Sequence, residues 1–213
     1  MHSEYAGSAM DVLVLSPHTD DSELAAGGTI SRLVREGHDV TYVVCSTCEA
    51  SLPDGETDTL RREFERVMDY VAPAGYQVLD YPVRRFDEHR QDILETFVSL
   101  RDELDPDLVL GPARADVHQD HAVVSAEMVR AFKSTSRLLG YEQPWNTPAF
   151  ETQLFASLTE ADLESKLEQL TRYESQTDRP YFDEEFVRGL ARVRGLQGDS
   201  RYAEAFEVVR WLL

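Results

Sequence analysis

Short apolar runs alternate with segments of helical periodicity over the first two thirds of this sequence. Four such runs predict buried strands at residues 11–15, 40–45, 78–81 and 108–111. The segments between them carry apolar residues at helical spacing, and a further helix is expected from about residue 120 to 132. This alternation implies right-handed crossovers and a mostly parallel sheet with helices on both faces. We therefore predict an α/β fold.

The last third of the sequence predicts two more strands and two more helices. Residues 138–142 and 150–155 are typical of strands, and Thr159 with Asp162 matches a capping box at the start of a helix. A last helix is expected to carry Ala205, Phe206, Val209 and Trp211. Because its 213 residues show no repeat or linker, we expect the chain 1–213 to form one domain. This domain would be a Rossmann-like three-layer sandwich after a short N-terminal tail at 1–10.

The acidic composition argues against several classes of partner. The chain has 40 acidic and 21 basic residues and a net charge of −19, which disfavours nucleic acid and anionic membranes. No apolar run approaches the ~18 residues of a membrane span. The first residues lack the pattern of a signal peptide, so a cytoplasmic protein is expected. Acid excess with two lysines, Lys133 and Lys166, favours a halophilic source, although a GC-rich genome that prefers arginine gives the same pattern.

Cys45 and Cys48 have the spacing of a redox pair. A thioredoxin-like domain would place such a pair at the start of a helix, whereas here a loop with Pro53 and Gly55 follows. We therefore expect Cys45 to be a small buried strand residue and Cys48 to open the loop.

A first cluster of chemistry-bearing residues, His18, Asp20 and Asp21, directly follows the first predicted strand. Ligands of open parallel sheets bind beyond the carboxyl ends of the strands. His18 and Asp21 are three residues apart and face the same way in a helical turn, which suggests that they bind a metal and leave Asp20 free to accept a proton from water. Alternatively, the aspartates are helix caps, and Gly27 and Gly28 serve helix–sheet packing or bind an anion.

A second cluster, His118, Asp120 and His121, follows the fourth predicted strand. A catalytic zinc usually has three protein ligands and one open position, a set that the first cluster and one of the two histidines would supply. Binding by both histidines would instead indicate a closed, structural site. Asp120 could orient a histidine. The alternative is that these histidines are surface residues near a helix start.

These two clusters resemble the motifs of the LmbE-like, or PIG-L, zinc-dependent de-N-acetylases. The stretch 17–21 with glycines 27–28 is similar to the first family motif, and 118–121 to the second. Stretches at 173–176 and 201–207 resemble two later motifs. Thr19 and Gln119 stand where proline is common, and Cys48 where glycine is common; none of these departures removes a metal ligand.

The resemblance implies a reaction and assigns roles to residues. The family removes an N-acetyl group from amino sugars with water activated by zinc, or by another divalent metal. By this resemblance His18, Asp21 and His121 would hold the metal and Asp20 would be the general base. His118, supported by Asp120, would stabilise the oxyanion or protonate the departing amine. The weaker candidates for substrate contacts are Arg62, Glu49 and Asp87. The expected partner is a small N-acetylated sugar or sugar conjugate; assembly stays open, with a homo-oligomer as one option.

Two other classes of function stay open at this point. One is a metal-dependent hydrolase of another amide or of a phosphate ester, with Arg84, Arg85 and Arg114 binding the phosphate. The other is a non-catalytic metal- or sugar-binding module with four ligands and no open position. Substrate choice is expected to depend on loops at 52–58, 84–90 and 141–148, and the aromatic residues that could stack on a sugar ring are Tyr141, Trp145 and Phe150.

Overall fold

The computed structural model describes residues 9–51 and 58–212. Most of the tail expected at 1–10 and most of the loop expected at 52–58 therefore lie outside the described residues. Among the described residues, no helix combines the length and apolar character needed to cross a bilayer.

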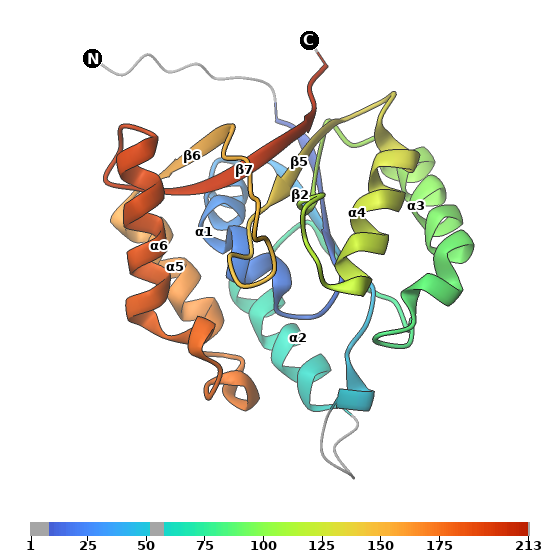
Figure 1. The fold of residues 1–213 in the computed structure, drawn as a ribbon, viewed down its shortest axis with the longest axis horizontal. Coiled ribbons are helices and arrows are strands. Elements are labelled where there is room, and N and C mark those ends of the chain that lie inside the picture. The colour runs from blue at the N-terminus through green and yellow to red at the C-terminus, as the bar shows by residue number, and fades with distance from the viewer. Residues whose placement is uncertain (1–8, 52–57, 213) are drawn as a thin grey trace.

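One seven-stranded sheet organises the described chain, in the order β3-β2-β1-β4-β5-β7-β6 (Figure 1). The first five strands of this order are parallel to one another. β7 is antiparallel to both of its neighbours. In sheet order the strands are β3 (Gly75–Val78), β2 (Asp39–Val44), β1 (Asp11–Ser16), β4 (Leu108–Pro112), β5 (Arg137–Tyr141), β7 (Tyr202–Arg210) and β6 (Leu154–Leu158). The prediction of a mostly parallel α/β sheet is confirmed.

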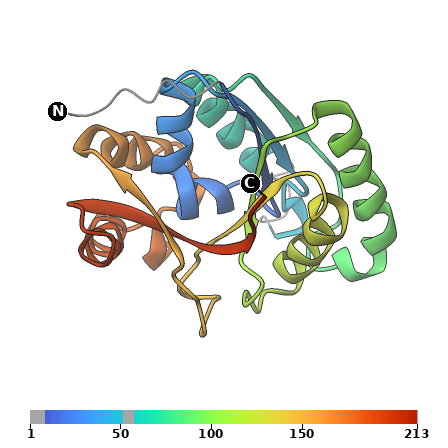
Figure 2. The same cartoon turned by 90° about the horizontal axis from the view of Figure 1, so that it is seen from above.

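Helices cover both faces of the sheet, because alternate residues of the buried strands point to opposite sides. Val12 and Val14 of β1 belong to the core formed with α1 (Asp21–Arg35) and α2 (Thr59–Val71). Leu13 and Leu15 belong to the core formed with the helices of the other face, α3 (Arg90–Leu104) and α4 (Gln119–Phe132). Figure 2 shows these two groups on opposite sides of the strands.

Two further helices extend the layer on the α1 side. α5 (Glu160–Leu170) packs against α1, and a small apolar cluster joins Leu24 of α1 to α5 and α6 (Glu184–Gln197). The expected capping box of α5 is present, since the Thr159 hydroxyl accepts from the Asp162 N–H and the Asp162 carboxylate accepts from the Thr159 N–H. The described residues also contain four short 3₁₀ turns: η1 (Glu49–Ser51), η2 (Phe86–His89), η3 (Glu174–Gln176) and η4 (Pro180–Phe182).

The predicted C-terminal helix is wrong, because residues 202–210 form strand β7. β7 lies between β5 and β6, and its residues 203–207 are all buried, so it lacks the alternation of buried and exposed residues that distinguishes a strand from a helix. The preceding helix α6 was not predicted, because it buries only the small stripe Val187, Ala191 and Gly195.

Two other strands are displaced from their predicted positions. β3 spans 75–78 rather than 78–81, and β6 begins at Leu154 rather than at residue 150. Both lie at an edge of the sheet and are only partly buried. Edge strands pair on one side only, so their hydrophobic pattern sets their limits weakly.

A buried carboxylate of β7 fixes the middle of α1. The helix departs from helical geometry at Ala26, with φ −133° and ψ 15°, which frees the N–H groups that follow. Glu204 accepts hydrogen bonds from the N–H groups of Gly28 at 3.1 Å and Thr29 at 2.7 Å. Its charge is paired with Lys166 at 2.7 Å. The anion anticipated at these glycines is therefore a side chain of the protein itself.

We predict that Glu204→Gln destabilises the fold by about 3 kcal/mol or more, because it leaves the buried ammonium of Lys166 without its partner. The matched control is Glu36→Gln, which breaks the exposed pair with Arg32 and should cost below ~1 kcal/mol. Urea unfolding followed by circular dichroism measures both. Equal losses in the two variants would contradict a stabilising role of the buried pair.

Candidate active site

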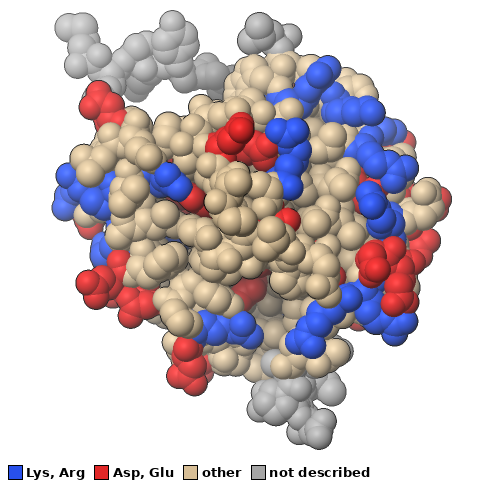
Figure 3. Space-filling model, in the orientation of Figure 1, with Lys and Arg blue, Asp and Glu red and all other residues tan. Residues whose placement is uncertain are grey.

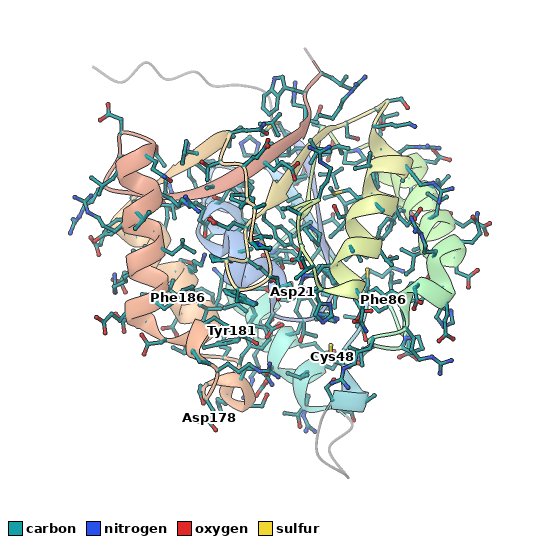
Figure 4. The ribbon with its side chains drawn as sticks, in the orientation of Figure 1. Asp21, Cys48, Phe86, Asp178, Tyr181 and Phe186 are labelled. Atoms are coloured by element: carbon teal, nitrogen blue, oxygen red, sulfur yellow. The ribbon has the colours of Figure 1, made fainter. Side chains whose placement is uncertain are left out.

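The two clusters meet at the carboxyl edge of the sheet because β1 and β4 are neighbours. Their parallel register pairs Val12 with Leu108 and Val14 with Leu110, so the chain leaves both strands on the same side. The sheet order reverses between β1 and β4, which is where open α/β sheets bind ligands. In Figure 4 the labelled Asp21 lies at this edge, with Cys48 and Tyr181 from other segments beside it.

A cavity of about 370 Å³ lies at this edge. This volume falls within the range of small-molecule sites. Residues of both clusters line it, together with residues from η1, from the loop before η2, from the loop after β5 and from η4. Figure 3 shows acidic atoms in a hollow of this face and basic atoms beside it.

Three ligand atoms converge at the inner end of the cavity. His18 Nδ1 lies 3.1 Å from Asp21 Oδ2, His121 Nε2 lies 3.2 Å from the same oxygen, and the two nitrogens are 3.3 Å apart. The edges of a tetrahedron around zinc are about 3.3 Å when the ligand bonds are 2.0–2.1 Å. The three atoms therefore form one face of such a tetrahedron, and the donor set of two imidazoles and one carboxylate is one that zinc accepts.

Each of the three groups is held by a further contact. The His18 ring bonds through Nε2 to the Asp120 carboxylate at 3.0 Å, and the His121 ring bonds through Nδ1 to the Asp116 carboxylate at 2.8 Å. Gln143 Nε2 donates to Asp21 Oδ1 at 2.8 Å, which leaves Oδ2 as the oxygen of the triangle. When the outer nitrogen of each ring donates to its carboxylate, the inner nitrogen keeps its lone pair for a metal.

The electrostatics of the triangle match a site built for a cation. Burial on its own lowers the pKa of His121, but Asp21 and the hydrogen bonds to Asp116 and Asp21 together raise it to about 9. The pKa of His18 is also raised well above its usual value, against the effect of burial, by Asp21 and Asp120. Burial alone would raise the pKa of Asp21, yet the charges of His121 and His18 hold it well below its usual range. The Asp21 side chain is therefore ionised and can pair with a positive charge.

Asp20 and His118 line the cavity beside the triangle. Burial, followed by the charge of Asp21, raises the pKa of Asp20 to about 6, and His18 partly opposes this shift. Burial and the charges of His121 and His18 lower the pKa of His118. His118 Nδ1 accepts the backbone N–H of Asp120 at 3.3 Å, so its Nε2 carries the proton.

His118 could itself serve as a ligand, because the three histidines offer nitrogens within 4.8 Å of one another. Asp21 completes the closer set, since its distances to the other two atoms are 3.1 and 3.2 Å. Asp120 differs from its expected role, because its carboxylate contacts His18 while only its backbone N–H reaches His118.

The structure does not bring Arg62 or Asp87, two of the three weaker candidates for substrate contacts, into this site. Arg62 is exposed on α2 and lines a different surface pocket, and Asp87 is exposed in η2. The backbone of Glu49 begins η1 next to Cys48, and its side chain lies outside the described residues. Neither Arg62 nor Asp87 contributes to the described wall of the cavity.

The arginines and aromatic residues that were also predicted to contact the substrate lie partly inside and partly outside the cavity wall. Among the arginines considered for phosphate, only Arg84 lines the cavity, since Arg85 pairs with Glu88 and Arg114 pairs with Glu207. Among the aromatic residues, Trp145 lines the cavity. Tyr141 is buried with its hydroxyl on the Leu15 carbonyl, and Phe150 lines another pocket.

Four residues of the site were missed from the sequence: Asp116, Gln143, Arg179 and Tyr181. Asp116 stands two residues before His118, and an acidic residue at that spacing was the one available signal. Gln143 comes from the loop after β5, and Arg179 and Tyr181 come from the segment around η4. These loops reach the site only because they pack on the carboxyl edge of the sheet, so no local sequence pattern marks the three residues: Gln143 contacts Asp21, and Arg179 and Tyr181 line the cavity.

The comparisons with known proteins agree with this geometry. The family profile described as "PIG-L: GlcNAc-PI de-N-acetylase" matches residues 13–132, which include both clusters. The diacetylchitobiose deacetylase of Thermococcus kodakarensis is 26% identical over 93% of this chain and 82% of its own length.

Two solved structures show the same fold. The N,N'-diacetylchitobiose deacetylase of Pyrococcus horikoshii superposes with a TM-score of 0.79, at 22% identity, over 95% of this chain and 84% of its own. GalB, the 4-carboxy-2-hydroxymuconate hydratase of Pseudomonas putida, superposes with a TM-score of 0.77, at 20% identity, over 96% of this chain and 98% of its own. One fold therefore carries a hydrolase and a hydratase, so the reaction has to be argued from the site.

We predict that Asp116→Ala lowers the affinity for a divalent metal by about 10–100-fold, because His121 loses the acceptor that fixes its ring and tautomer. The control is Asp102→Ala, which removes an exposed carboxylate on α3. Competition with a chromogenic chelator measures the affinity. Unchanged affinity in Asp116→Ala would mean that His121 does not need this orientation to bind.

Proposed function

The chain belongs to the PIG-L family of de-N-acetylases, and we propose that it is a zinc-dependent hydrolase that removes the N-acetyl group of an amino sugar. The observation that carries the proposal is the triangle of His18 Nδ1, His121 Nε2 and Asp21 Oδ2, with all three distances between 3.1 and 3.3 Å. His18, Asp21 and His121 would hold the metal, and the cavity provides the open position.

The residues around the triangle would carry out different steps of amide hydrolysis. When bound, the metal supplies positive charge that lowers the pKa of water toward ~7 and polarises the carbonyl of the substrate. The Asp20 carboxylate, which is outside the ligand triangle, accepts the proton of the attacking water. His118 Nε2–H donates a hydrogen bond to the oxygen on which negative charge develops, and the proton that Asp20 took from water passes to the departing amine. Asp120 and Asp116 hold the two ligand rings in place.

The choice of an N-acetylated amino sugar rests on the relatives. The similar Thermococcus protein is named for diacetylchitobiose, a small N-acetylated sugar, and the family profile is named for an N-acetylglucosamine conjugate. The cavity supports this choice, because a stacked pair of aromatic rings, Trp145 and Tyr181, lines it, with ring centroids 4.3 Å apart. Aromatic faces with polar groups around them suit the mixed surface of a sugar ring.

We expect Asp20→Asn to retain the metal and to lose turnover by about 10²–10⁴-fold, because the base is removed while the ligand triangle is kept. Metal content by atomic emission and acetate release measure the two properties. Asp105→Asn, at an exposed left-handed position far from this edge, is the matched control. Loss of the metal from Asp20→Asn would reassign Asp20 as a ligand.

Acetate release from diacetylchitobiose or N-acetylglucosamine should disappear after chelation and return when zinc is added back. Mass spectrometry separates the alternatives, because deacetylation removes an acetyl group whereas a hydratase of the GalB type adds water to its substrate. Metal binding without turnover of any N-acetylated sugar would favour a binding module. Release of phosphate from an ester instead would favour the phosphate-ester hydrolase.

A further inference from the structure

Arg84 and Arg179 belong to the minority of arginines in the described residues that form no ion pair, and both lie in the wall of the cavity. Most of its arginines form an ion pair with a carboxylate, as Arg90 does with Glu127. Arg84 and Arg179 form no ion pair with any carboxylate of the described residues, although the chain has 40 acidic residues to offer. Both line the cavity that contains the two clusters.

The backbone of Arg84 is held firmly in an unusual conformation. Its φ is 66°, in the left-handed region where a glycine would be least strained. Its N–H donates to the Asp120 carboxylate at 2.7 Å, and its carbonyl accepts from Gln119 at 3.2 Å. Its guanidinium donates to the Ser51 hydroxyl at 3.1 Å. This conformation is uncommon for a residue other than glycine, and here it lies beside Asp120, which also holds the His18 ring.

Arg179 is held by an aromatic neighbour rather than by an acid. Its Nη1 donates to the Tyr181 hydroxyl at 2.8 Å, and its guanidinium lies 5.9 Å from the centre of that ring. Tyr181 is in turn stacked on Trp145. The charge of Arg179 reaches Asp20, whose pKa it lowers slightly against larger opposing effects. The guanidinium is therefore positioned near the reacting groups while most of its donors stay free for a ligand.

We propose that Arg84 and Arg179 form a subsite for an anionic group, a carboxylate or a phosphate, on the substrate. The inference rests on the proposed function and narrows its substrate class to acidic N-acetylated sugars or their conjugates. A planar guanidinium binds both kinds of anion through paired hydrogen bonds. Without such groups, a protein of net charge −19 would repel an anionic substrate from a cavity that already contains Asp20 and Asp21.

The position of the two arginines fits a substrate that spans the cavity. Its N-acetyl group would lie at the ligand triangle, its sugar ring beside Trp145 and Tyr181, and its anionic group at the guanidinium groups. A neutral sugar would make no ion pair with the two guanidinium groups, and this difference is a source of discrimination between neutral and anionic substrates.

The test compares three sugars that differ in charge: N-acetylglucosamine, its phosphate ester on the primary hydroxyl, and its uronic acid. The wild type should show a KM at least about tenfold lower for one or both anionic sugars than for the neutral one. The anion that shows the advantage distinguishes phosphate from carboxylate. Arg84→Gln and Arg179→Gln should each raise the KM for that sugar by about tenfold, with a small change in kcat and in the KM for the neutral sugar.

Arg210→Gln is the matched control, because Arg210 is exposed at the end of β7 that pairs with the start of β5, at the opposite edge of the sheet. It removes the same charge and should leave all three KM values unchanged. Equal KM values for the three sugars in the wild type, or equal effects of the variants on all of them, would overturn the proposal.

A separate measurement distinguishes failure of the subsite from failure of the proposed function. Calorimetry of inorganic phosphate and of glycolate needs no turnover, and binding should be lost in the double variant Arg84→Gln and Arg179→Gln but kept in Arg210→Gln. If no sugar releases acetate while this pattern holds, the reaction is wrong and the subsite stands. If acetate is released but neither anion binds through these arginines, the subsite is wrong and the reaction stands.

Discussion

The parallel pairing of β1 with β4 is the constraint on which the site depends. These two strands are separated by almost a hundred residues of sequence, yet their register pairs Leu13 with Val109. The residues that follow them, His18 and Asp21 on one side and His121 on the other, then converge to within 3.3 Å. A slip in this pairing would separate the two histidine nitrogens and the carboxylate oxygen of the triangle.

The triangle also depends on residues that do not belong to it. Three carboxylates and an amide, from Asp116, Asp120, Glu204 and Gln143, hold the ligand rings, the ligand carboxylate and the helix that carries it. In an interior of low polarity each of these contacts is strong when complete and costly when broken. This explains how a chain with such an excess of negative charge can place several more acids around its functional centre.

The strands of the parallel core and the two clusters that follow them could be predicted, because each is marked by a local sequence pattern. The strands of the parallel core are continuous apolar runs, so β1, β2 and β4 were predicted to within a residue or two. Both clusters directly follow such strands, which made their meeting at one edge predictable from the fold alone. β7 was wrongly predicted as a helix, because burial on both faces removes the period-two pattern of a strand.

The residues of the site that escaped sequence reasoning share one property. Gln143, Arg179 and Tyr181 come from loops whose position is set by long-range packing. The residues next to them in the sequence form no motif that indicates a functional site. Arg62 and Asp87 show the opposite case. The resemblance to the family suggested them as substrate contacts, but both are exposed and lie away from the cavity. The motifs therefore located the residues that meet in the triangle, whereas Arg62 and Asp87 lie away from the cavity.

Glu204 has a consequence for the order in which the protein is assembled. Its carboxylate lies on the last strand of the chain but caps the interrupted turn of α1, which begins at Asp21. During synthesis the first helix emerges from the ribosome long before this cap exists. The edge of the sheet that carries Asp21 therefore gains its full rigidity only after β7 has been made, and a chain that stops before Glu204 would keep Asp21 at the start of an unfinished helix.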